Sequence, residues 1–347
     1  MSGIRELTGR KAEILRALVH YYIRTGEPVG SEALAAMASL GVSSATIRNE
    51  LAALEEMGFL TQPHTSAGRA PTDLAYRYYV DLLPSRPRLR DSERKAIVHF
   101  FDEALADVDD ILRGTTVLLS RLTRYASLAL APSPKEISIA RAELVALGTA
   151  TLILVVFDTG HVEKRVLEVP EGITDDEVES VSRWMTEAFR GKTLAGAREA
   201  ASMGARKVTD RERALFERAT EALGSIEVGA LAEHVVLGGV ANIAAEEGFQ
   251  HRATLRQVYE ALERESAILR LLREAAGAPP VSVTIGRENP MPEMWEASVV
   301  AAPYGAGGGA LGTIGVVGPT RMDYASAISA VRAVADRLSA AVEALAH

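Results

Sequence analysis

The chain has 347 residues, enough for two or three domains, and 48% of them are hydrophobic, so buried cores can form. Its formal net charge of −8 argues against a general nucleic-acid coat protein, and the absence of cysteine excludes disulfides, thiolate metal sites and cysteine nucleophiles. The first residues lack the apolar core of a signal peptide, and the longest apolar stretch, LVALGTATLILVVF, is too short to span a bilayer. We therefore expect a soluble, cytoplasmic protein with no membrane partner.

The first expected element is an amphipathic helix from Arg10 to Thr25, which Gly26 ends. Two shorter helices follow it, and the long helix should brace them. The first of the two begins at Ser31. Its spacing turns three apolar side chains inward, those of Ala33, Leu34 and Met37.

The second short helix, ATIRNELAALEEMG, has the features of a recognition helix that enters the DNA major groove. Gly41 supplies the turn before it, and a serine can cap its start. Its apolar side chains recur every three or four residues and should face inward. These are Ile47, Leu51 and Leu54. The polar side chains that we expect to contact base edges and phosphates are Ser43, Ser44, Thr46, Arg48 and Asn49.

A glycine-bearing wing should follow this helix. Gly58 ends the helix, and a short strand from Phe59 to Thr61 leads to a polar tip and a return at Ala70. The side chains near the tip that can contact phosphate or a groove are His64, Thr65, Ser66 and Arg69. The alternative is an ordinary three-helix bundle whose polar residues face water.

The charge of this N-terminal segment is the main compositional argument against DNA binding. Residues 1–83 contain eight basic and nine acidic side chains, so their formal net charge is 8 − 9 = −1. A site-specific reader needs a local basic face rather than a basic domain. The charge therefore predicts weak non-specific binding and makes dimerisation more necessary.

A further helix, TDLAYRYYVDLL, begins after the wing. Ala75, Tyr78, Tyr79 and Leu82 have the spacing of one buried face, so we interpret the tyrosines as core rather than as base-stacking groups. Arg77 on the same helix could reach the DNA backbone near the wing. The proline- and arginine-rich stretch at 84–91 reads as a linker.

The rest of the chain alternates helical and strand patterns, which indicates an α+β fold. Residues 92 to about 130 are expected to be helical, with Gly114 dividing two helices. Three adjacent strands should follow, in ISIARAELVALG, TLILVVFDTG and HVEKRVLEV, and then a helix capped by Thr174. PVSVTIG, WEASVVAAPY and LGTIGVVG read as three more strands, and an amphipathic helix closes the chain.

No catalytic or metal-binding constellation stands out, so we expect neither an enzyme nor a cofactor or metal. Gly307, Gly309 and Gly312 match G-x-G-x-x-G, but a strand rather than a helix follows, which favours a hairpin loop. The seven histidines are scattered, and none pairs with another at metal-ligand spacing such as i, i+4.

Two polar motifs, IGREN and GPTRMDY, leave two interpretations open. They place charged and polar groups at strand ends and at a helix start, where an anionic ligand could bind. The interpretation that we favour is a cluster of hydrogen bonds and ion pairs between domains. The side chains concerned are Arg287, Glu288, Asn289, Arg321, Asp323 and Tyr324.

Several of these stretches together resemble the HrcA family, the heat-inducible transcription repressors of bacteria. The resemblance rests on PVGS, VSSATIRNELAALEEMGFL and PHTSAGRAPTDLAYRYYVD near the start, and on GGVANI, IGREN and GVVGPTRMDY in the C-terminal half. One mild departure is Ala70, which stands where many relatives have a larger aliphatic residue.

The resemblance implies an α+β, multidomain protein. The expected parts are a winged helix-turn-helix at 1–83, a linker at 84–91, a GAF-like domain at 92–164 and 246–347, and an inserted, mostly helical dimerising domain at 165–245. It further implies a homodimer that represses chaperone operons from an inverted-repeat operator of double-stranded DNA and is released on heat stress. A GroEL-type chaperonin would keep the repressor active, although the dimer could instead sense heat itself by local unfolding.

Two other functions stay open. One is a ligand-controlled transcription regulator that senses a small molecule in the GAF-like domain. The other is a winged-helix module for protein–protein contact, which the nearly neutral N-terminal segment permits.

Overall fold

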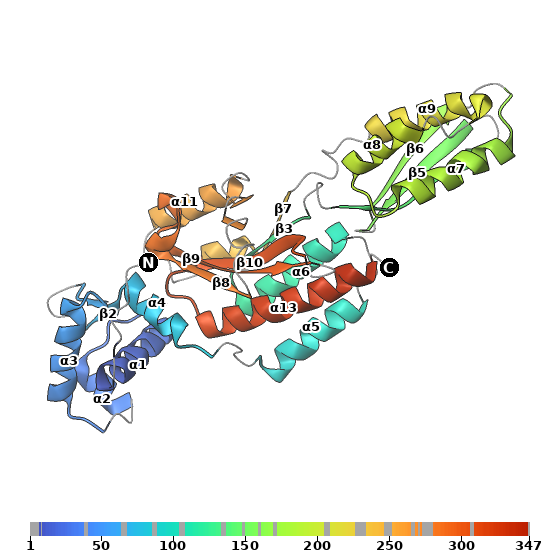
Figure 1. Cartoon of the computed structure of the whole chain (residues 1–347). Coiled ribbons are helices and arrows are strands. Elements are labelled where there is room, and N and C mark those ends of the chain that lie inside the picture. The colour runs from blue at the N-terminus through green and yellow to red at the C-terminus, as the bar shows by residue number, and fades with distance from the viewer. Residues whose placement is uncertain are drawn as a thin grey trace.

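The computed structural model describes residues 7, 9–37, 41–63, 68–84, 89–103, 108–132, 137–147, 150–158, 161–168, 172–204, 209–225, 234–245, 252–264, 268–269, 271–272, 280–305 and 309–345. Three bodies follow one another along an elongated molecule (Figure 1). We call them the N-terminal domain (9–83), the central unit (89–132 and 234–345) and the peripheral unit (137–225).

The N-terminal domain is a set of helices with a two-stranded wing. Helix α1 covers Arg10–Thr25, as predicted, and ends at Gly26, whose φ is 73°. Strand β1 (Leu60–Thr61) pairs antiparallel with β2 (Ala70–Pro71), with Thr61 opposite Ala70, so the predicted strand and return are confirmed. The remaining helices are α2 (Ser31–Met37), α3 (Ser44–Glu56) and α4 (Asp73–Asp81).

The core of this domain follows the predicted periodicity of α3, because Ile47, Leu51 and Leu54 are all buried. Gly41 and Gly58 have φ values of 62° and 82°, in the left-handed region that glycine enters at little cost. The turns on either side of α3 therefore form where glycine was expected to allow them.

Two inward assignments in this domain are wrong. Ala33 is exposed because the short helix α2 turns Leu34 toward the core instead. Leu82 is 51% exposed because it follows the last residue of α4 and lies beyond the buried face. Tyr78 and Tyr79 are buried in the core, as expected, whereas the side chain of Met37 lies outside the described residues.

The central unit is built on a five-stranded antiparallel sheet in the order β7–β3–β10–β9–β8. Alternate side chains of its strands enter two different cores, one shared with α6 and α13 and the other with α11. The strands are β3 (Ala126–Leu130), β7 (Val235–Gly238), β8 (Ser282–Ile285), β9 (Ala297–Tyr304) and β10 (Gly312–Pro319). The helices are α5 (Asp91–Glu103), α6 (Val108–Thr123), α10 (Ala241–Ala245), α11 (Arg252–Glu263) and α13 (Tyr324–Leu345), with short 3-10 turns η1 (Gly286–Glu288) and η2 (Pro292–Met294).

The prediction of helix up to about residue 130 is wrong at its end. Helix α6 stops at Thr123, and residues 126–130 form β3, in which every side chain is buried. Gly114 does not divide two helices but lies inside α6. A Cβ atom there would come within 2.7 Å of the Phe100 ring of α5, so the glycine allows α5 and α6 to approach closely.

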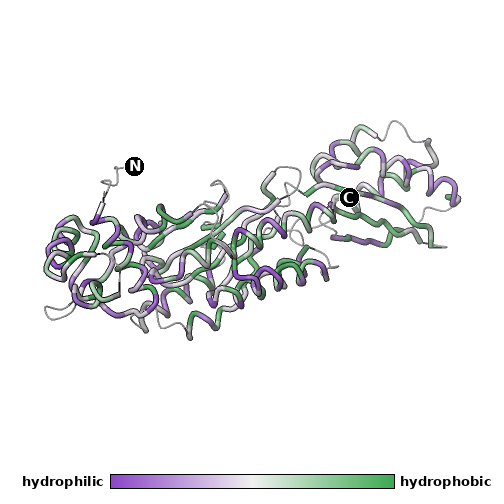
Figure 2. Tube along the Cα trace, turned by 90° about the horizontal axis from the view of Figure 1, so that it is seen from below, coloured by the Kyte–Doolittle hydropathy of each residue, from purple (hydrophilic) through white to green (hydrophobic). Residues whose placement is uncertain are grey.

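The peripheral unit has its own sheet and its own core. Strands β4 (Ile139–Leu147), β5 (Ala150–Phe157) and β6 (Val162–Glu168) form the predicted antiparallel meander. Helices α7 (Asp175–Phe189), α8 (Leu194–Gly204) and α9 (Asp210–Ser225) pack on one face of it. Thr174 caps α7 through its side chain, as predicted. Figure 2 shows both hydrophobic (green) and hydrophilic (purple) stretches in the strands of this unit.

These boundaries differ from those of the inserted domain that was expected at 165–245. All three strands at 139–168 pair with one another and share a core with α7, α8 and α9. Strand β7 belongs to the central sheet instead, where it is the neighbour of β3. The peripheral unit is thus inserted between two paired strands, and the amide of Ala131 donates to the carbonyl of His234 at 3.0 Å where the chain leaves and returns.

Candidate nucleic-acid interface

The start of α3 presents the polar side chains that were predicted to read DNA. Ser43 caps the helix, and its Oγ accepts a hydrogen bond from the amide of Thr46 at 3.2 Å. The hydroxyls of Ser43 and Thr46 also lie 3.0 Å apart, so each already has one partner. Ser44 is half-buried beside them. The hydroxyls of Ser43 and Thr46 therefore stabilise the first turn of the helix.

Arg48 and Asn49 differ from these serines and threonine. Both are exposed, and neither forms a hydrogen bond or an ion pair with another described residue. The preceding residue, Ile47, is fully buried in the core and fixes this part of the helix in place. The chemical types suit base edges, since arginine pairs with guanine and asparagine with adenine. The two side chains that were predicted as base readers are therefore available for that contact.

Acidic side chains of α3 neutralise two of the positive charges next to this helix. Lys11 of α1 pairs with Glu50 at 2.9 Å, and Arg69 of the wing pairs with Glu55 at 2.8 Å. Arg48 is left as the exposed cation of α3 that has no partner among the described residues. The interface consequently has little general attraction for phosphate, which agrees with the near-neutral charge of the segment.

Arg69, which was predicted to contact DNA, also holds the wing against the rest of the domain. Its backbone forms a two-way bridge with Val29, with both N–O distances 2.9 Å. The preceding Gly68 lies so close to Val29 that a Cβ atom there would be 2.3 Å from the Val29 carbonyl carbon. Arg69 thus joins the wing to the start of α2 and, through Glu55, to α3. The predicted wing residues His64, Thr65 and Ser66 lie outside the described residues.

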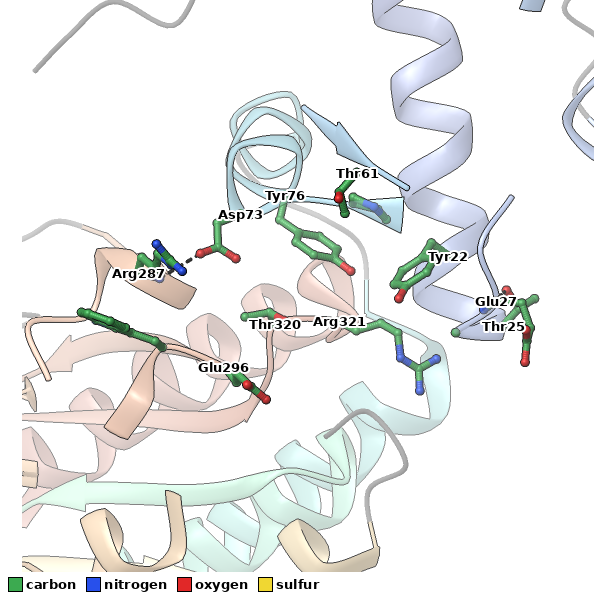
Figure 3. A pocket seen from close by; sticks show the side chains of 13 residues that line it. Tyr22, Thr25, Glu27, Thr61, Asp73, Tyr76, Arg287, Glu296, Thr320 and Arg321 are labelled. Atoms are coloured by element: carbon green, nitrogen blue, oxygen red, sulfur yellow. Dashed lines mark hydrogen bonds between the residues drawn. The ribbon is translucent and has the colours of Figure 1, made fainter. Parts of the chain in front are cut away.

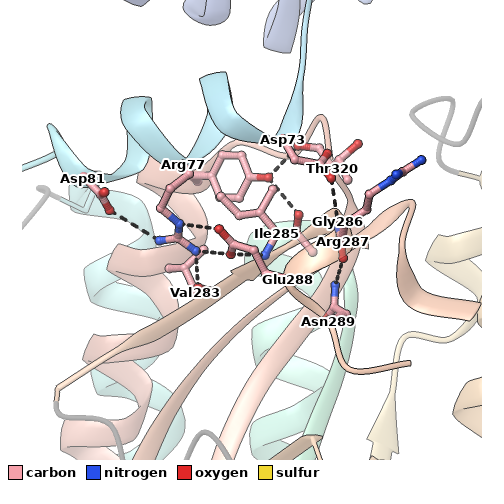
Figure 4. A network of polar contacts seen from close by, with 12 residues as sticks. Asp73, Arg77, Asp81, Val283, Ile285, Gly286, Arg287, Glu288, Asn289 and Thr320 are labelled. Carbon is pink, nitrogen blue, oxygen red and sulfur yellow. Dashed lines mark hydrogen bonds and ion pairs between the residues drawn. The ribbon is translucent and has the colours of Figure 1, made fainter. Parts of the chain in front are cut away.

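A second polar cluster joins the N-terminal domain to the central unit (Figure 4). The guanidinium of Arg77 on α4 donates through Nε to Glu288 Oε1 at 2.8 Å and through Nη2 to the carbonyl of Val283 at 2.6 Å. Nη2 also contacts the other oxygen of Glu288. Hydrogen bonding to Glu288 is the main reason why the pKa of Arg77 is raised. Arg77 is therefore engaged between domains, and these contacts compete with the DNA backbone contact that the sequence suggested for it.

Asp73, one helical turn earlier on α4, makes the second contact of this cluster. Its Oδ2 accepts from the backbone amide of Arg287 at 2.9 Å. Burial raises the pKa of the Asp73 carboxyl, and the hydrogen bond from Arg287 opposes that shift. The preferred interpretation of IGREN as an interdomain cluster is thus confirmed by the contacts of Arg287 and Glu288.

A cavity of about 630 Å³ lies beside this cluster, with walls from both domains (Figure 3). Tyr76 of α4 is 3% exposed, and its hydroxyl has no hydrogen-bond partner among the described residues. Arg321 of the central unit donates to the carbonyl of Ile23 over 3.4 Å and has no described carboxylate partner. Three carboxylates also line the cavity, those of Glu27, Asp73 and Glu296. The cavity therefore has mixed charge.

Within the described part of the chain, no group of three or more histidine, aspartate or glutamate side chains could hold a metal ion. The helices described there are too short or too polar to cross a bilayer. Gly309 lies between the antiparallel partners β9 and β10, and Gly312 is the first residue of β10, so the prediction of a hairpin rather than a dinucleotide-binding turn is confirmed. Gly307 lies outside the described residues.

Comparison with known proteins gives matches to both halves of the chain. Residues 6–81 match the family model described as "Winged helix-turn-helix transcription repressor, HrcA DNA-binding". Residues 109–328 match the model described as "HrcA protein C terminal domain".

Individual relatives agree with these family models. The "Heat-inducible transcription repressor HrcA" of Thermobifida fusca is 44% identical over 330 residues, which is 95% of each chain. The repressor of the same description from Nocardia farcinica is 42% identical and covers 94% of each chain. A crystal structure described as that of a hypothetical protein has a TM-score of 0.65 at 22% identity, covering 98% of this chain and 100% of that one, so it shows a shared fold.

Proposed function

Because the chain belongs to the HrcA family of heat-inducible transcription repressors, we propose that it binds, as a homodimer, an inverted-repeat operator of chaperone operons in the cytoplasm. The family consists of DNA-binding repressors, not of enzymes, and the winged helix is the DNA-binding part. The observation that carries the proposal is the exposed pair Arg48 and Asn49 on the first turns of α3, free of partners among the described residues.

The base readers that we propose are Arg48 and Asn49, the two exposed residues that follow the buried Ile47. Ser43, Ser44 and Thr46 would contact phosphate at the helix start, where backbone amides favour an anion. His64, Thr65 and Ser66 would contact the flanking groove or backbone from the wing. Arg69 would do so only by sharing its guanidinium with Glu55, to which it is already bound at 2.8 Å.

The dimer would form through the peripheral unit, which we propose as the inserted dimerising domain of a GAF-like central unit. Its helices cover one face of the sheet, and the other face has exposed apolar side chains. Val145 and Val166 flank Leu152 across the three strands and are 41% and 70% exposed. An apolar row of this kind on an uncovered sheet face is typical of a surface that is buried in an assembly.

Release on heat and maintenance by a GroEL-type chaperonin complete the proposal. Any partner that binds or regenerates the native state raises its population, so diversion of a chaperonin to heat-damaged proteins would lower active repressor. The competing version is intrinsic sensing by local unfolding. Operator binding measured across temperature, with and without chaperonin, separates the two, since full and reversible loss that chaperonin does not change would favour intrinsic sensing.

A second function is favoured by the cavity between the domains. A small anionic molecule bound there by Arg321 and the Tyr76 hydroxyl would contact both domains at once and could alter DNA affinity. The cavity that supports this alternative is lined by both domains, whereas the sequence suggested a ligand inside the GAF-like domain. A change in operator affinity with a panel of small phosphorylated and carboxylated metabolites would support it.

The test of the main proposal is binding to a chaperone-operon inverted repeat, compared with a scrambled duplex, over a series of salt concentrations. We expect tight binding that needs both half-sites and weakens steeply with salt. Equal and weak binding to both duplexes by a protein shown to be dimeric would contradict sequence-specific reading. A salt-insensitive protein partner would support the alternative of a protein–protein module.

A further inference from the structure

The two contacts of α4 with the central unit come from the same side of one helix. Asp73 and Arg77 are four residues apart, so their side chains lie one above the other on the helix surface. Asp73 holds the backbone of η1 at Arg287, and Arg77 holds the side chain of Glu288 and the carbonyl of Val283. We call this set of contacts the α4–η1 clasp.

The receiving side of the clasp is itself held in place. The Glu288 carboxylate accepts from the amide of Ile285 at 2.8 Å, at the start of its own turn. Asn289, which is 2% exposed, donates through its amide group to the carbonyls of Gly286, Met294 and Ala297 at 2.8 to 3.1 Å. Since η1 is fixed by these bonds, two contact points on α4 restrict both its distance from the central unit and its rotation.

The contact also depends on the glycine of η1, which leaves room for the Asp73 side chain. Gly286 has a φ of 50°, and a Cβ atom at this position would lie 2.3 Å from Oδ2 of Asp73. The Asp73 carboxylate therefore occupies the space that any other side chain would need. A substitution at Gly286 would push the two surfaces apart without changing a charge.

Movement of α4 would be transmitted directly to the DNA-binding elements. The wing strand β2 ends at Pro71 and α4 begins at Asp73, with Thr72 as the helix cap. The Thr72 hydroxyl donates to the carbonyls of Gly58 and Phe59, immediately after α3. A change in the angle of α4 thus changes the angle of the wing and of α3.

We propose that the α4–η1 clasp sets the separation and relative rotation of the two recognition helices, and thereby determines which half-site spacing of the operator is accepted. The inference rests on the proposed dimeric operator reader. Asp73, Arg77 and Glu288 are in this sense positioning residues, which act on DNA through α3. One added base pair turns a half-site by about 35° around the duplex, so a dimer with firmly placed recognition helices discriminates strongly between spacings.

The experiment measures binding of the full-length chain to duplexes whose two half-sites are separated by the natural spacer or by spacers one and two base pairs shorter or longer. A duplex with a single half-site is measured in parallel. The variants are Arg77→Ala, Glu288→Ala, the double variant, and Gly286→Ala. The matched control is Arg256→Ala, because Arg256 forms an exposed pair with Glu260 within α11 and takes no part in the clasp.

For the wild type and for Arg256→Ala we expect affinity to fall about tenfold or more when the spacer changes by one base pair. The clasp variants should keep their affinity for the single half-site within about twofold and should lose most of this discrimination, because their recognition helices are less firmly placed. The double variant should resemble the two single ones, since all three break the same contact.

Two results would overturn the inference. One is unchanged discrimination between spacers in Arg77→Ala and Gly286→Ala. The other is loss of single half-site affinity together with a lowered melting temperature, because the clasp would then support folding only. A wild type that is dimeric but binds the full operator no better than the single half-site would contradict the proposed function itself, which is a different outcome.

Discussion

The N-terminal domain and the peripheral unit are attached to the central unit in opposite ways. Buried residues of the N-terminal domain belong to one hydrophobic cluster with β10 and α13, and the rings of Tyr76 and Tyr324 lie 5.9 Å apart across the boundary. The peripheral unit has a separate cluster, from Ile137 to Leu223. A body with a shared core keeps its orientation, whereas a body with its own core needs only a chain connection. The N-terminal domain, which carries α3, is thus held more firmly against the central unit than the peripheral unit is.

Deletion of the peripheral unit is the strongest way to break this comparison. The amide of Ala131 donates to the carbonyl of His234 at 3.0 Å, so a short glycine-containing turn can replace residues 132–233. We expect the remaining chain to fold and to unfold in one thermal transition, because one hydrophobic cluster runs from the N-terminal domain to α13 and the central sheet joins it to the cluster around α11. It should bind an inverted repeat no better than a single half-site. Calorimetry and operator binding check both points, and failure to fold would show that the two cores depend on each other.

Substitution on the uncovered face of the peripheral sheet tests what that unit contributes. Val166 is 70% exposed on β6, so Val166→Lys should leave the fold intact and shift the chain from dimer to monomer in sedimentation analysis. The matched control is Met203→Lys on α8, at a side chain that is 66% exposed on the helical side. Equal effects of the two substitutions would contradict the assignment of the dimer surface to the sheet face.

Substitution of Arg48 sharpens the other side of the comparison. Arg48→Ala should weaken operator binding by about 1–3 kcal/mol per half-site and leave the melting temperature unchanged, since the side chain is exposed and has no described partner. Arg94→Ala, on the exposed surface of α5, removes the same charge and should have little effect. Arg48 would not belong to the interface if both variants bound the operator as tightly as the wild type.

The smallest expected effect is a pH-dependent change in melting temperature, caused by Asp73 at the boundary between the N-terminal domain and the central unit. Burial raises the pKa of Asp73 in the folded chain, so its contribution to stability is present below the unfolded pKa and is lost as pH rises through the folded one. We therefore expect the melting temperature of the wild type to fall relative to that of Asp73→Asn as pH rises from about 3 to about 6. Thermal melts over this range check the sign, and parallel curves would contradict it.

The parts of the fold that were predictable depend on short-range signals. Gly26, Gly41 and Gly58 mark turns that need a positive φ, and Ser43 and Thr174 cap helices through bonds to residues three positions on. These signals lie within a few residues of the structure that they determine. The winged helix and the exposed pair on α3 could be predicted for this reason.

The parts that could not be predicted depend on contacts between distant residues. Residues 126–130 are buried on both faces, so they lack the alternation that distinguishes a strand from a helix. Gly114 does not mark a turn; its missing side chain leaves room for the ring of Phe100, which belongs to another helix. The partner of Arg77 is 211 residues away, and no spacing in the sequence relates the two. Strands β4 to β6 were predicted from their sequence pattern. Their separation from the central sheet was not, because it depends on which distant strands pair with one another.

The place where the peripheral unit is inserted has a consequence for the order of folding during synthesis. Ser127 of β3 donates to Gly238 of β7, which is 111 residues further along the chain, and the other neighbour, β10, is made later still. At typical rates of translation β3 waits about ten seconds with both edges unpaired, whereas the N-terminal domain already has all its elements. An apolar strand with open edges is prone to aggregate. Each new copy therefore passes through a stage in which its winged helix has been made, while the strands and the helix that complete the shared core and pair with β3 have not.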